Sequence, residues 1–233
     1  MSTRYNPSIV RDSMLLYLDA ANTKSYPGSG TTWYDLSGNN KNPTLTNGPT
    51  FNSDNLGSIV LDGTNDYVEF SPGTNITSDT VVLSGSYTAS FLFFSSNNGS
   101  NNDQMWLCEK HNGGNGLSLY RYQEGNVCIR TMGGNRYSWS CPYRTNIKNK
   151  LCFLDFISNG TTLEFYLNNV SQGTVTPNDV TINVNRLGSN RFTVSNDNQS
   201  LDGRFYNVRF YDRALTRSEI DQNYNALKGR FGL

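Results

Sequence analysis

Two acidic residues, Asp155 and Glu164, are the leading candidates for chemistry in this sequence. They lie in two β-rich segments, 151–158 and 161–167, joined by Asn159-Gly160, the dipeptide that most strongly favours a two-residue hairpin turn. With that turn, Asp155 would face Glu164, at a Cβ separation of about 4.5–5.5 Å. Retaining glycosidases hold two carboxyl groups about 5–5.5 Å apart. The pair could therefore hydrolyse glycans; the alternative is two solvated carboxylates on an exposed sheet face.

A single histidine, His111, limits the catalytic arrangements that the chain can build. A Ser-His-Asp or Cys-His mechanism would have to use it, and the sequence has no nucleophile-elbow motif. His111 lies in the Asn- and Gly-rich segment 109–114, which is typical of a solvated loop. We therefore expect a protein that is not an enzyme.

Residues suited to sugar binding gather between positions 135 and 139. Sugar sites combine aromatic rings with amide and charged hydrogen-bonding groups. Strand alternation would place Tyr137 and Trp139 on one face. The sequence therefore predicts a ligand site at Asn135, Arg136, Tyr137 and Trp139, and the alternative for the two rings is a stripe of core residues.

Composition excludes several classes of protein. The 233 residues carry 19 basic and 19 acidic side chains, so the net charge is zero, and no basic run is present for nucleic-acid binding. No apolar stretch approaches the ~20 residues of a membrane span, and the N-terminus lacks the apolar core of a signal peptide. The cysteines match no zinc spacing, and we expect buried reduced thiols, with a disulfide as the alternative outside a cell. They are Cys108, Cys128, Cys141 and Cys152.

Short strands separated by polar turns dominate the chain. We expect strands at 14–19, 57–61, 67–70, 87–94, 104–109, 116–122, 126–132, 136–140, 151–158, 161–167 and 170–175. In the 151–167 hairpin the predicted register places Cys152 opposite Leu167 and Leu154 opposite Phe165, on one apolar face. The turn at 62–66 predicts a hairpin-like corner, and Asn168-Asn169 a second tight turn. This spacing is typical of a β-sandwich or barrel.

The C-terminal segment predicts a closing strand and a capped helix. In the strand 203–211, alternation places Tyr206, Val208 and Phe210 on one face. Thr216 and Glu219 form a capping box, and Leu215 and Ile220 stand at the positions of a hydrophobic staple. Ile220, Tyr224 and Leu227 form one helical stripe, and Gly229 is placed for a left-handed C-terminal cap.

Four segments, in order along the chain, carry a resemblance: 35–39, 59–68, 163–170 and 203–220. Together they resemble laminin-G-like modules of the concanavalin A-like jelly-roll superfamily. The resemblance implies an all-β, two-sheet antiparallel jelly-roll sandwich with a short C-terminal helix. We expect an N-terminal arm at 1–13 and one laminin-G-like domain at 14–233. The acidic strand motif that is usual in the glycanases of this superfamily is absent.

Related folds bind structural calcium through carboxylate and carbonyl oxygens at turns. Aspartates stand at such turns and strand ends here, at Asp19, Asp35, Asp62, Asp66 and Asp202. Asp35 and Asp62 are the preferred candidates for a calcium site, and calcium is the only cofactor expected. The alternative is that each aspartate caps its own turn.

The segments 15–19 and 224–231 also resemble modules of bacteriophage virion proteins, especially of cyanobacterial phages. The resemblance implies a place on a tail fibre or capsid surface, reached from the host cytoplasm without a signal peptide. We expect a non-enzymatic adhesion or display module whose partners are virion proteins, host surface glycans and copies of itself, with no nucleic acid or inserted membrane. The alternatives are a capsid decoration or attachment protein that docks through Tyr5, Pro7, Ile9 and Val10, and a glycan-depolymerising enzyme.

Overall fold

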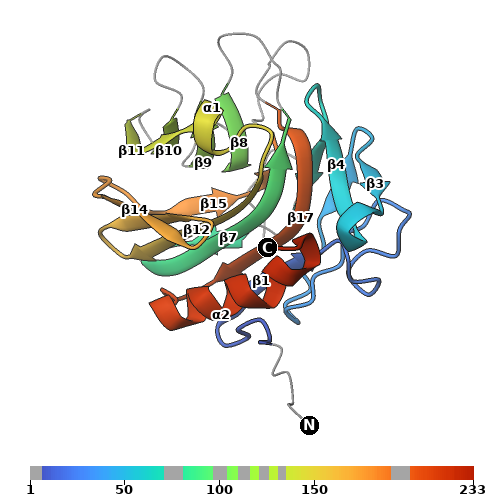
Figure 1. Cartoon of the computed structure of the whole chain (residues 1–233), viewed down its shortest axis with the longest axis horizontal. Coiled ribbons are helices and arrows are strands. Elements are labelled where there is room, and N and C mark those ends of the chain that lie inside the picture. Colours follow the sequence, from blue (N-terminus) through green and yellow to red (C-terminus); the bar gives the residue numbers. More distant parts are fainter. Residues whose placement is uncertain are drawn as a thin grey trace.

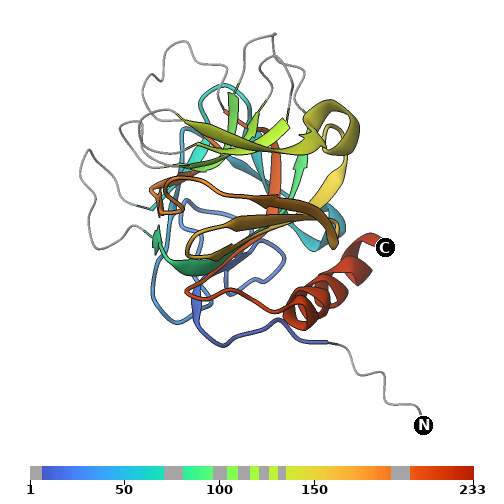
Figure 2. The ribbon, with the colours of Figure 1, turned by 90° about the vertical axis from the view of Figure 1, so that its left-hand side faces the viewer.

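The computed structural model describes residues 7–70, 81–96, 104–109, 116–120, 126–130, 135–189 and 200–233. Two antiparallel sheets pack face to face, and a helix near the C-terminus lies against the outside of the larger sheet (Figure 1, Figure 2). This arrangement confirms the predicted all-β jelly-roll sandwich with a short C-terminal helix. None of the helices in the described part of the chain is long and apolar enough to cross a bilayer.

The larger sheet has eight strands in the order β14-β13-β12-β7-β17-β4-β3, and β1 also pairs with β17. The first half of β17 pairs with β4 and the second half pairs with β1. The closing strand therefore joins three others into one surface. The bounds are β1 Met14–Asp19, β3 Thr50–Asn52, β4 Ser58–Asp62, β7 Ser86–Ser95, β12 Leu151–Asn159, β13 Leu163–Leu167, β14 Val170–Val175 and β17 Asp202–Tyr211.

The smaller sheet has seven strands in the order β11-β10-β9-β8-β16-β5-β2. Its bounds are β2 Thr44–Thr46, β5 Tyr67–Glu69, β8 Gln104–Glu109, β9 Gly116–Tyr120, β10 Asn126–Arg130, β11 Arg136–Pro142 and β16 Arg186–Leu187. A separate pair consists of β6 Val81–Leu83 and β15 Ile182–Val184. The helices are α1 Tyr143–Asn146, α2 Arg217–Lys228 and the 3-10 turns η1 Asp54–Leu56 and η2 Gly229–Phe231.

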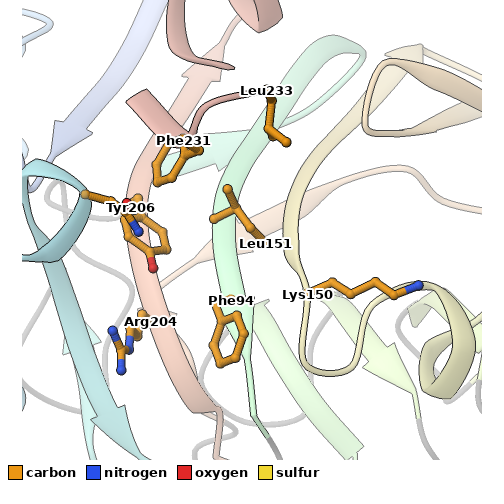
Figure 3. A pocket seen from close by; sticks show the side chains of 8 residues that line it. Phe94, Lys150, Leu151, Arg204, Tyr206, Phe231 and Leu233 are labelled. Atoms are coloured by element: carbon orange, nitrogen blue, oxygen red, sulfur yellow. The ribbon is translucent and has the colours of Figure 1, made fainter. Parts of the chain in front are cut away.

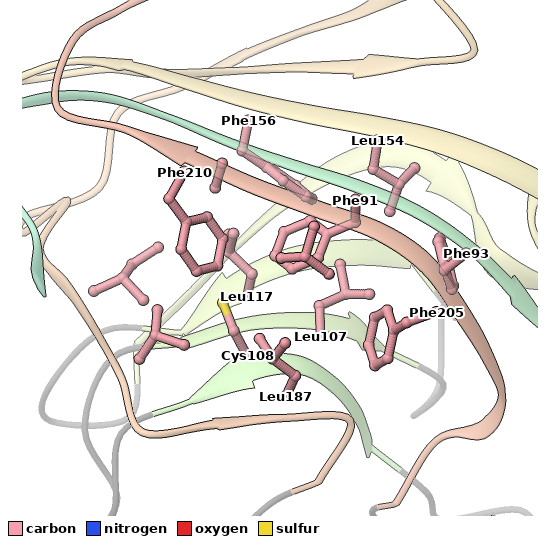
Figure 4. Close-up of a cluster of buried hydrophobic side chains, with 14 of the residues drawn as sticks. Phe91, Phe93, Leu107, Cys108, Leu117, Leu154, Phe156, Leu187, Phe205 and Phe210 are labelled. Atoms are coloured by element: carbon pink, nitrogen blue, oxygen red, sulfur yellow. The ribbon is translucent and has the colours of Figure 1, made fainter. Parts of the chain in front are cut away.

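The core lies between the two sheets and is rich in phenylalanine (Figure 4). Phe91, Phe156 and Phe210 of the larger sheet point toward Leu107 and Leu117 of the smaller one. Complete burial of each such side chain contributes about 1.5–3 kcal/mol. Trp33 is also fully buried, while the Trp106 side chain and His111 lie outside the described residues.

All four cysteines are buried, as predicted, and none of them forms a disulfide bond with another described residue. Burial raises the pKa of the Cys152 thiol to about 12, and it also raises the pKa of Cys141. The neutral thiol is therefore the stable form, and these side chains act as small hydrophobic groups.

The predicted register of the β12–β13 hairpin is wrong by two residues. Asp155 pairs with Tyr166 and Ile157 pairs with Glu164, so Asp155 does not face Glu164. The turn residues are Gly160, with a φ of 100°, and Thr161, while Asn159 ends the strand and its side chain accepts hydrogen bonds from the Thr161 and Thr162 amides. The second turn is as predicted, because Asn168 and Asn169 both have positive φ.

The predicted face of Tyr206 in β17 is wrong, because the strand contains a β-bulge. The register against β7 shifts between Phe205 and Asn207, so Tyr206 is the extra residue. Phe205, Val208 and Phe210 therefore join the central core, whereas Tyr206 packs on the outer side of the sheet. Simple alternation predicted that Tyr206 and Val208 share one face, and the bulge places Tyr206 on the opposite face.

Helix α2 begins with the predicted capping box. The Thr216 hydroxyl accepts from the Glu219 amide and the Glu219 carboxylate accepts from the Thr216 amide. Leu215 and Ile220 share one apolar cluster, as expected for a staple. The predicted left-handed cap at Gly229 is wrong: its φ is −62°, the chain continues into η2, and Gly232 takes the left-handed conformation.

The turn after Asp62 connects the two sheets instead of closing a hairpin. Strand β4 belongs to the larger sheet and β5 to the smaller one, so the predicted hairpin-like corner is a crossing between layers. The Asp62 carboxylate accepts hydrogen bonds from the Thr64 and Asn65 amides, which fixes the turn.

Candidate functional site

The outer face of the larger sheet, on the side away from the core, carries an open groove. Its cavity has a volume of about 610 Å³ (Figure 3). The groove residues come from strands β7, β12 and β17, the turns η1 and η2, and their flanking segments. They are Asn55, Phe94, Lys150, Leu151, Arg204, Tyr206, Phe231 and Leu233.

Strand register explains the floor of the groove. Arg204 on β17 pairs with Phe94 on β7, and Phe94 pairs with Leu151 on β12. The three side chains therefore form one row across neighbouring strands. The Arg204 guanidinium lies 6.0 Å from the centre of the Phe94 ring, so a cation and an aromatic ring face the same opening.

The bulge and the continued C-terminal turn build one wall of the groove. The bulge turns Tyr206 outward, and its ring meets the ring of Phe231 edge to face with centres 5.1 Å apart. Phe231 reaches this position because Gly229 stays right-handed and the chain runs on as η2. Both departures from the sequence prediction thus contribute an aromatic ring to the groove.

Arg230 fixes η1 and η2 around the groove. Its guanidinium pairs with Asp19 at 2.9 Å and donates to the Asn55 carbonyl oxygen at 3.4 Å. The pair is mostly buried, with 12% of the Arg230 side chain and 10% of the Asp19 side chain exposed. The strand β1 and both turns are therefore held to one another.

The charged side chains that line the groove are both positive, Arg204 and Lys150. Of the residues that the structure describes, none with a carboxylate side chain lines the cavity, and none pairs with Arg204 or Lys150. The Lys150 ammonium is exposed and donates to the Thr145 carbonyl oxygen at 2.5 Å. The groove thus presents two cations beside three aromatic rings.

The same outer face is closed under α2, where it carries a buried polar row formed by Arg209, Ser90 and Asp155. Register places these three on adjacent strands β17, β7 and β12. The Ser90 hydroxyl donates to the Asp155 carboxylate at 2.5 Å. Burial raises the pKa of Asp155, and the charge of Arg209 opposes the rise. Asp155 is only 6% exposed, so it is not available to a solvent-borne substrate.

Helix α2 and the N-terminal segment cover the buried polar row. The buried Asn223 accepts from the Val10 amide at 2.9 Å and donates to the Tyr211 hydroxyl at 3.1 Å. The Tyr211 hydroxyl donates to the Val10 carbonyl oxygen at 3.2 Å. Val10, named above as a docking residue, is therefore buried within its own chain, while Tyr5 lies outside the described residues.

The predicted sugar-binding residues lie elsewhere, on and before the edge strand β11 of the smaller sheet. Asn135 and Arg136 are exposed, and the Tyr137 hydroxyl donates to Asn178 Oδ1 at 3.2 Å. Trp139 is 2% exposed and packs against the stacked rings of Phe156 and Phe165, with ring centres 5.5 and 5.4 Å away. Its ring faces are covered by the core, and sugar contact at Asn135, Arg136 and Tyr137 stays a prediction.

The predicted calcium ligands organise their own loops. The oxygens of Asp35 accept from the amides of Tyr17, Ser37 and Lys41 and from the Ser37 hydroxyl. Asp62 accepts from its own turn, as described above. The described residues contain no group of three or more His, Cys, Asp or Glu side chains that could hold a metal ion. A calcium ion at Asp35 or Asp62 stays a prediction.

Sequence reasoning missed every residue of the open groove. They come from segments separated by up to 178 positions, from Asn55 to Leu233, and no spacing links them. The one local signal was Arg204, a charged residue in an aromatic strand that closes the larger sheet.

Two antiparallel sheets packed face to face define a jelly-roll β-sandwich domain (Figure 1). The model of the concanavalin A-like lectin/glucanases superfamily, Laminin_G_3, matches residues 62–221, more than half of the chain, and the protein belongs to this family. Among curated protein sequences, none matches the chain.

Solved structures share the fold at low sequence identity. The binding domain of Paraclostridial Mosquitocidal Protein 1 is 19% identical with a TM-score of 0.62, over 93% of this chain and 52% of that one. The ligand binding domain of botulinum neurotoxin serotype D, in complex with N-acetylneuraminic acid, is 16% identical with a TM-score of 0.62, over 92% and 51%. The chain thus spans about half the length of these toxin domains.

A third structure is matched over nearly its whole length. It is domain 4 of AbnA, an extracellular arabinanase of Geobacillus stearothermophilus, in complex with arabinotriose. The identity is 18% and the TM-score 0.64, over 92% of this chain and 98% of that one. At such identities the likeness establishes the fold.

Proposed function

We propose that this protein is a non-catalytic module that binds glycans in the open groove. The observation that carries the proposal is the combination of Phe94, Tyr206 and Phe231 with Arg204 and Lys150 around one cavity. Aromatic rings pack against the apolar faces of sugar rings, and cations and amides bind their polar groups. The complexes of related folds with N-acetylneuraminic acid and arabinotriose support this choice of ligand class.

The proposal that the module is non-catalytic is supported by the surroundings of Asp155 and Glu164. Asp155 is sealed in the buried polar row, and Glu164 pairs with Ile157 and accepts a hydrogen bond from Ser171 at 2.8 Å. A glycosidase needs two carboxyl groups open to one bond of the substrate. The depolymerising alternative therefore has no support at Asp155 and Glu164.

Display on a phage virion is the second half of the proposal, on a tail fibre or on the capsid surface. It is supported by the resemblance of segments 15–19 and 224–231 to virion modules. Antibodies raised against the purified protein should label intact phage particles in electron micrographs. Labelling of host envelopes alone would contradict this placement.

An array of host surface polysaccharides and oligosaccharides tests glycan binding. We expect the wild-type protein to bind at least one glycan at millimolar concentration or below. Phe94→Ala should weaken that binding about 10-fold, which corresponds to the loss of one aromatic contact. Tyr34→Ala, at an exposed tyrosine that does not line the groove, is the matched control and should bind as the wild type does. No binding to any glycan on the array would contradict the proposal.

A further inference from the structure

We propose that the open groove recognises the carboxylate of an acidic sugar, and that Arg204 is the residue that binds it. This inference rests on the glycan-binding function proposed above and names the chemical class of the ligand. Arg204 is the one half-buried arginine of the described residues that has no carboxylate partner.

Four arginines of the described chain are half-buried, and three of them hold a carboxylate. Arg186 pairs with Glu69 at 2.8 Å, Arg213 with Glu219 at 2.7 Å and Arg230 with Asp19 at 2.9 Å. The fourth is Arg204, for which the described residues provide only the ring of Phe94. A guanidinium that has lost part of its water without gaining a partner is a ready site for an external anion.

The surroundings of Arg204 fit a carboxylated sugar. The guanidinium presents a planar fork that matches a carboxylate in two parallel hydrogen bonds. The half-buried Phe94 lies beside it and offers apolar surface to the ring that bears the carboxylate, while the buried Tyr206 lies at the base of the cavity (Figure 3). Lys150 lines the same cavity and adds a second positive charge.

The geometry of the donor groups favours a carboxylate on the ligand. Lys150 is exposed and already donates one hydrogen bond to Thr145, so Arg204 is the main unsatisfied donor group. The planar fork of its guanidinium matches the two coplanar oxygens of a carboxylate better than the tetrahedral oxygens of a phosphate monoester. We therefore assign the site to a uronic or sialic acid residue.

Matched pairs of probes test the assignment by calorimetric titration. The first pair is a galacturonic acid tetramer and its methyl ester, which removes the charge and keeps the sugar. The second pair is sialyllactose and lactose. We expect at least one acidic probe to bind about 10- to 100-fold more tightly than its neutral partner, as for a charge-assisted hydrogen-bonded pair. Higher salt should reduce this preference.

Arg204→Gln should remove the preference for the acid, so that the acidic probe and its neutral partner bind with similar affinity. Arg144→Gln, at an exposed arginine outside the groove, is the matched control and should keep the preference. Thermal unfolding of both variants checks that each remains folded.

Two results would overturn the inference. If acidic and neutral partners bind equally and Phe94→Ala weakens both, the groove binds glycans without reading a carboxylate, and only the proposed function survives. If a sulfated disaccharide binds through Arg204 and no carboxylated probe does, the anion is a sulfate. Failure of every glycan on the array would instead reject the proposed function itself.

Discussion

Two regions of the same sheet face differ in how their charges are satisfied. The buried polar row lies under α2, where Arg209, Ser90 and Asp155 are enclosed with the polar groups of neighbouring strands. The open groove lies farther along β7, β12 and β17, where Arg204 has a ring beside it and no carboxylate of the described chain. Both regions lie on the same face of the same sheet, and they differ in whether helix α2 covers them. The covered region is a buried structural cluster, and the uncovered region is the candidate binding site.

Removal of a buried carboxylate should have the largest effect on stability. Asp155→Ala deletes the acceptor for Ser90 and the negative charge that faces the buried Arg209. We expect a loss of about 3 kcal/mol in the free energy of unfolding, measured with urea. Glu164→Ala is the control on the next strand, and it should cost less than about 1 kcal/mol because Glu164 is only partly buried. Equal losses for the two variants would show that the buried polar row does not contribute more to stability than a partly buried carboxylate does.

Asn223→Ala should loosen the cover over the polar row. The change leaves the Val10 amide without its acceptor and takes one partner from the Tyr211 hydroxyl. We expect a cost of about 2 kcal/mol in urea unfolding, because buried polar groups lose their hydrogen bonds. Asn225→Ala, at an exposed position of the same helix, is the control. An unchanged midpoint for Asn223→Ala would mean that the N-terminal segment does not hold the helix.

The capping box gives a smaller effect that depends on pH. Hydrogen bonds from Arg213 hold the pKa of Glu219 at about 2, below its usual value. A lowered folded-state pKa stabilises the fold above the unfolded-state value of about 4.3 and loses this effect as the pH falls toward 2. Glu219→Gln should therefore cost about 1 kcal/mol at pH 7, and the difference from wild type should shrink between pH 4.3 and about 2. A constant difference across this range would contradict the assignment.

Substitutions in the groove should affect stability least. Arg204→Gln and Lys150→Gln remove charges that have no carboxylate partner among the described residues. Each should change the free energy of unfolding by no more than about 0.5 kcal/mol. Lys24→Gln, at an exposed loop position, is the control. A cost above about 1 kcal/mol at Arg204 would indicate a structural role and weaken the contrast between the two regions.

Local signals in the sequence were enough to predict individual elements. The capping box at Thr216, the Asn168-Asn169 turn and the strand at 104–109 all form as predicted. The β12–β13 register was missed by two residues because side-chain alternation has a period of two. A shift of two keeps the same residues on the apolar face, so the pattern could not distinguish the two registers.

The candidate site was out of reach of the sequence for another reason. Tyr206 faces the groove because of a bulge, and Phe231 because Gly229 does not end the helix in a left-handed cap. Arg204 meets Leu151 only through Phe94 on the strand between them. None of these relations is local, so they follow from the packing of the sheet and not from spacing along the chain.

Amide chemical-shift mapping during titration with the galacturonic acid tetramer tests the central claim most directly. If the open groove is the binding site, the largest shifts will fall on Phe94, Leu151, Arg204 and Tyr206, while Ser90, Asp155 and Arg209 under α2 will hardly move. Shifts centred on Asn135–Trp139, or on the buried polar row, would contradict the account.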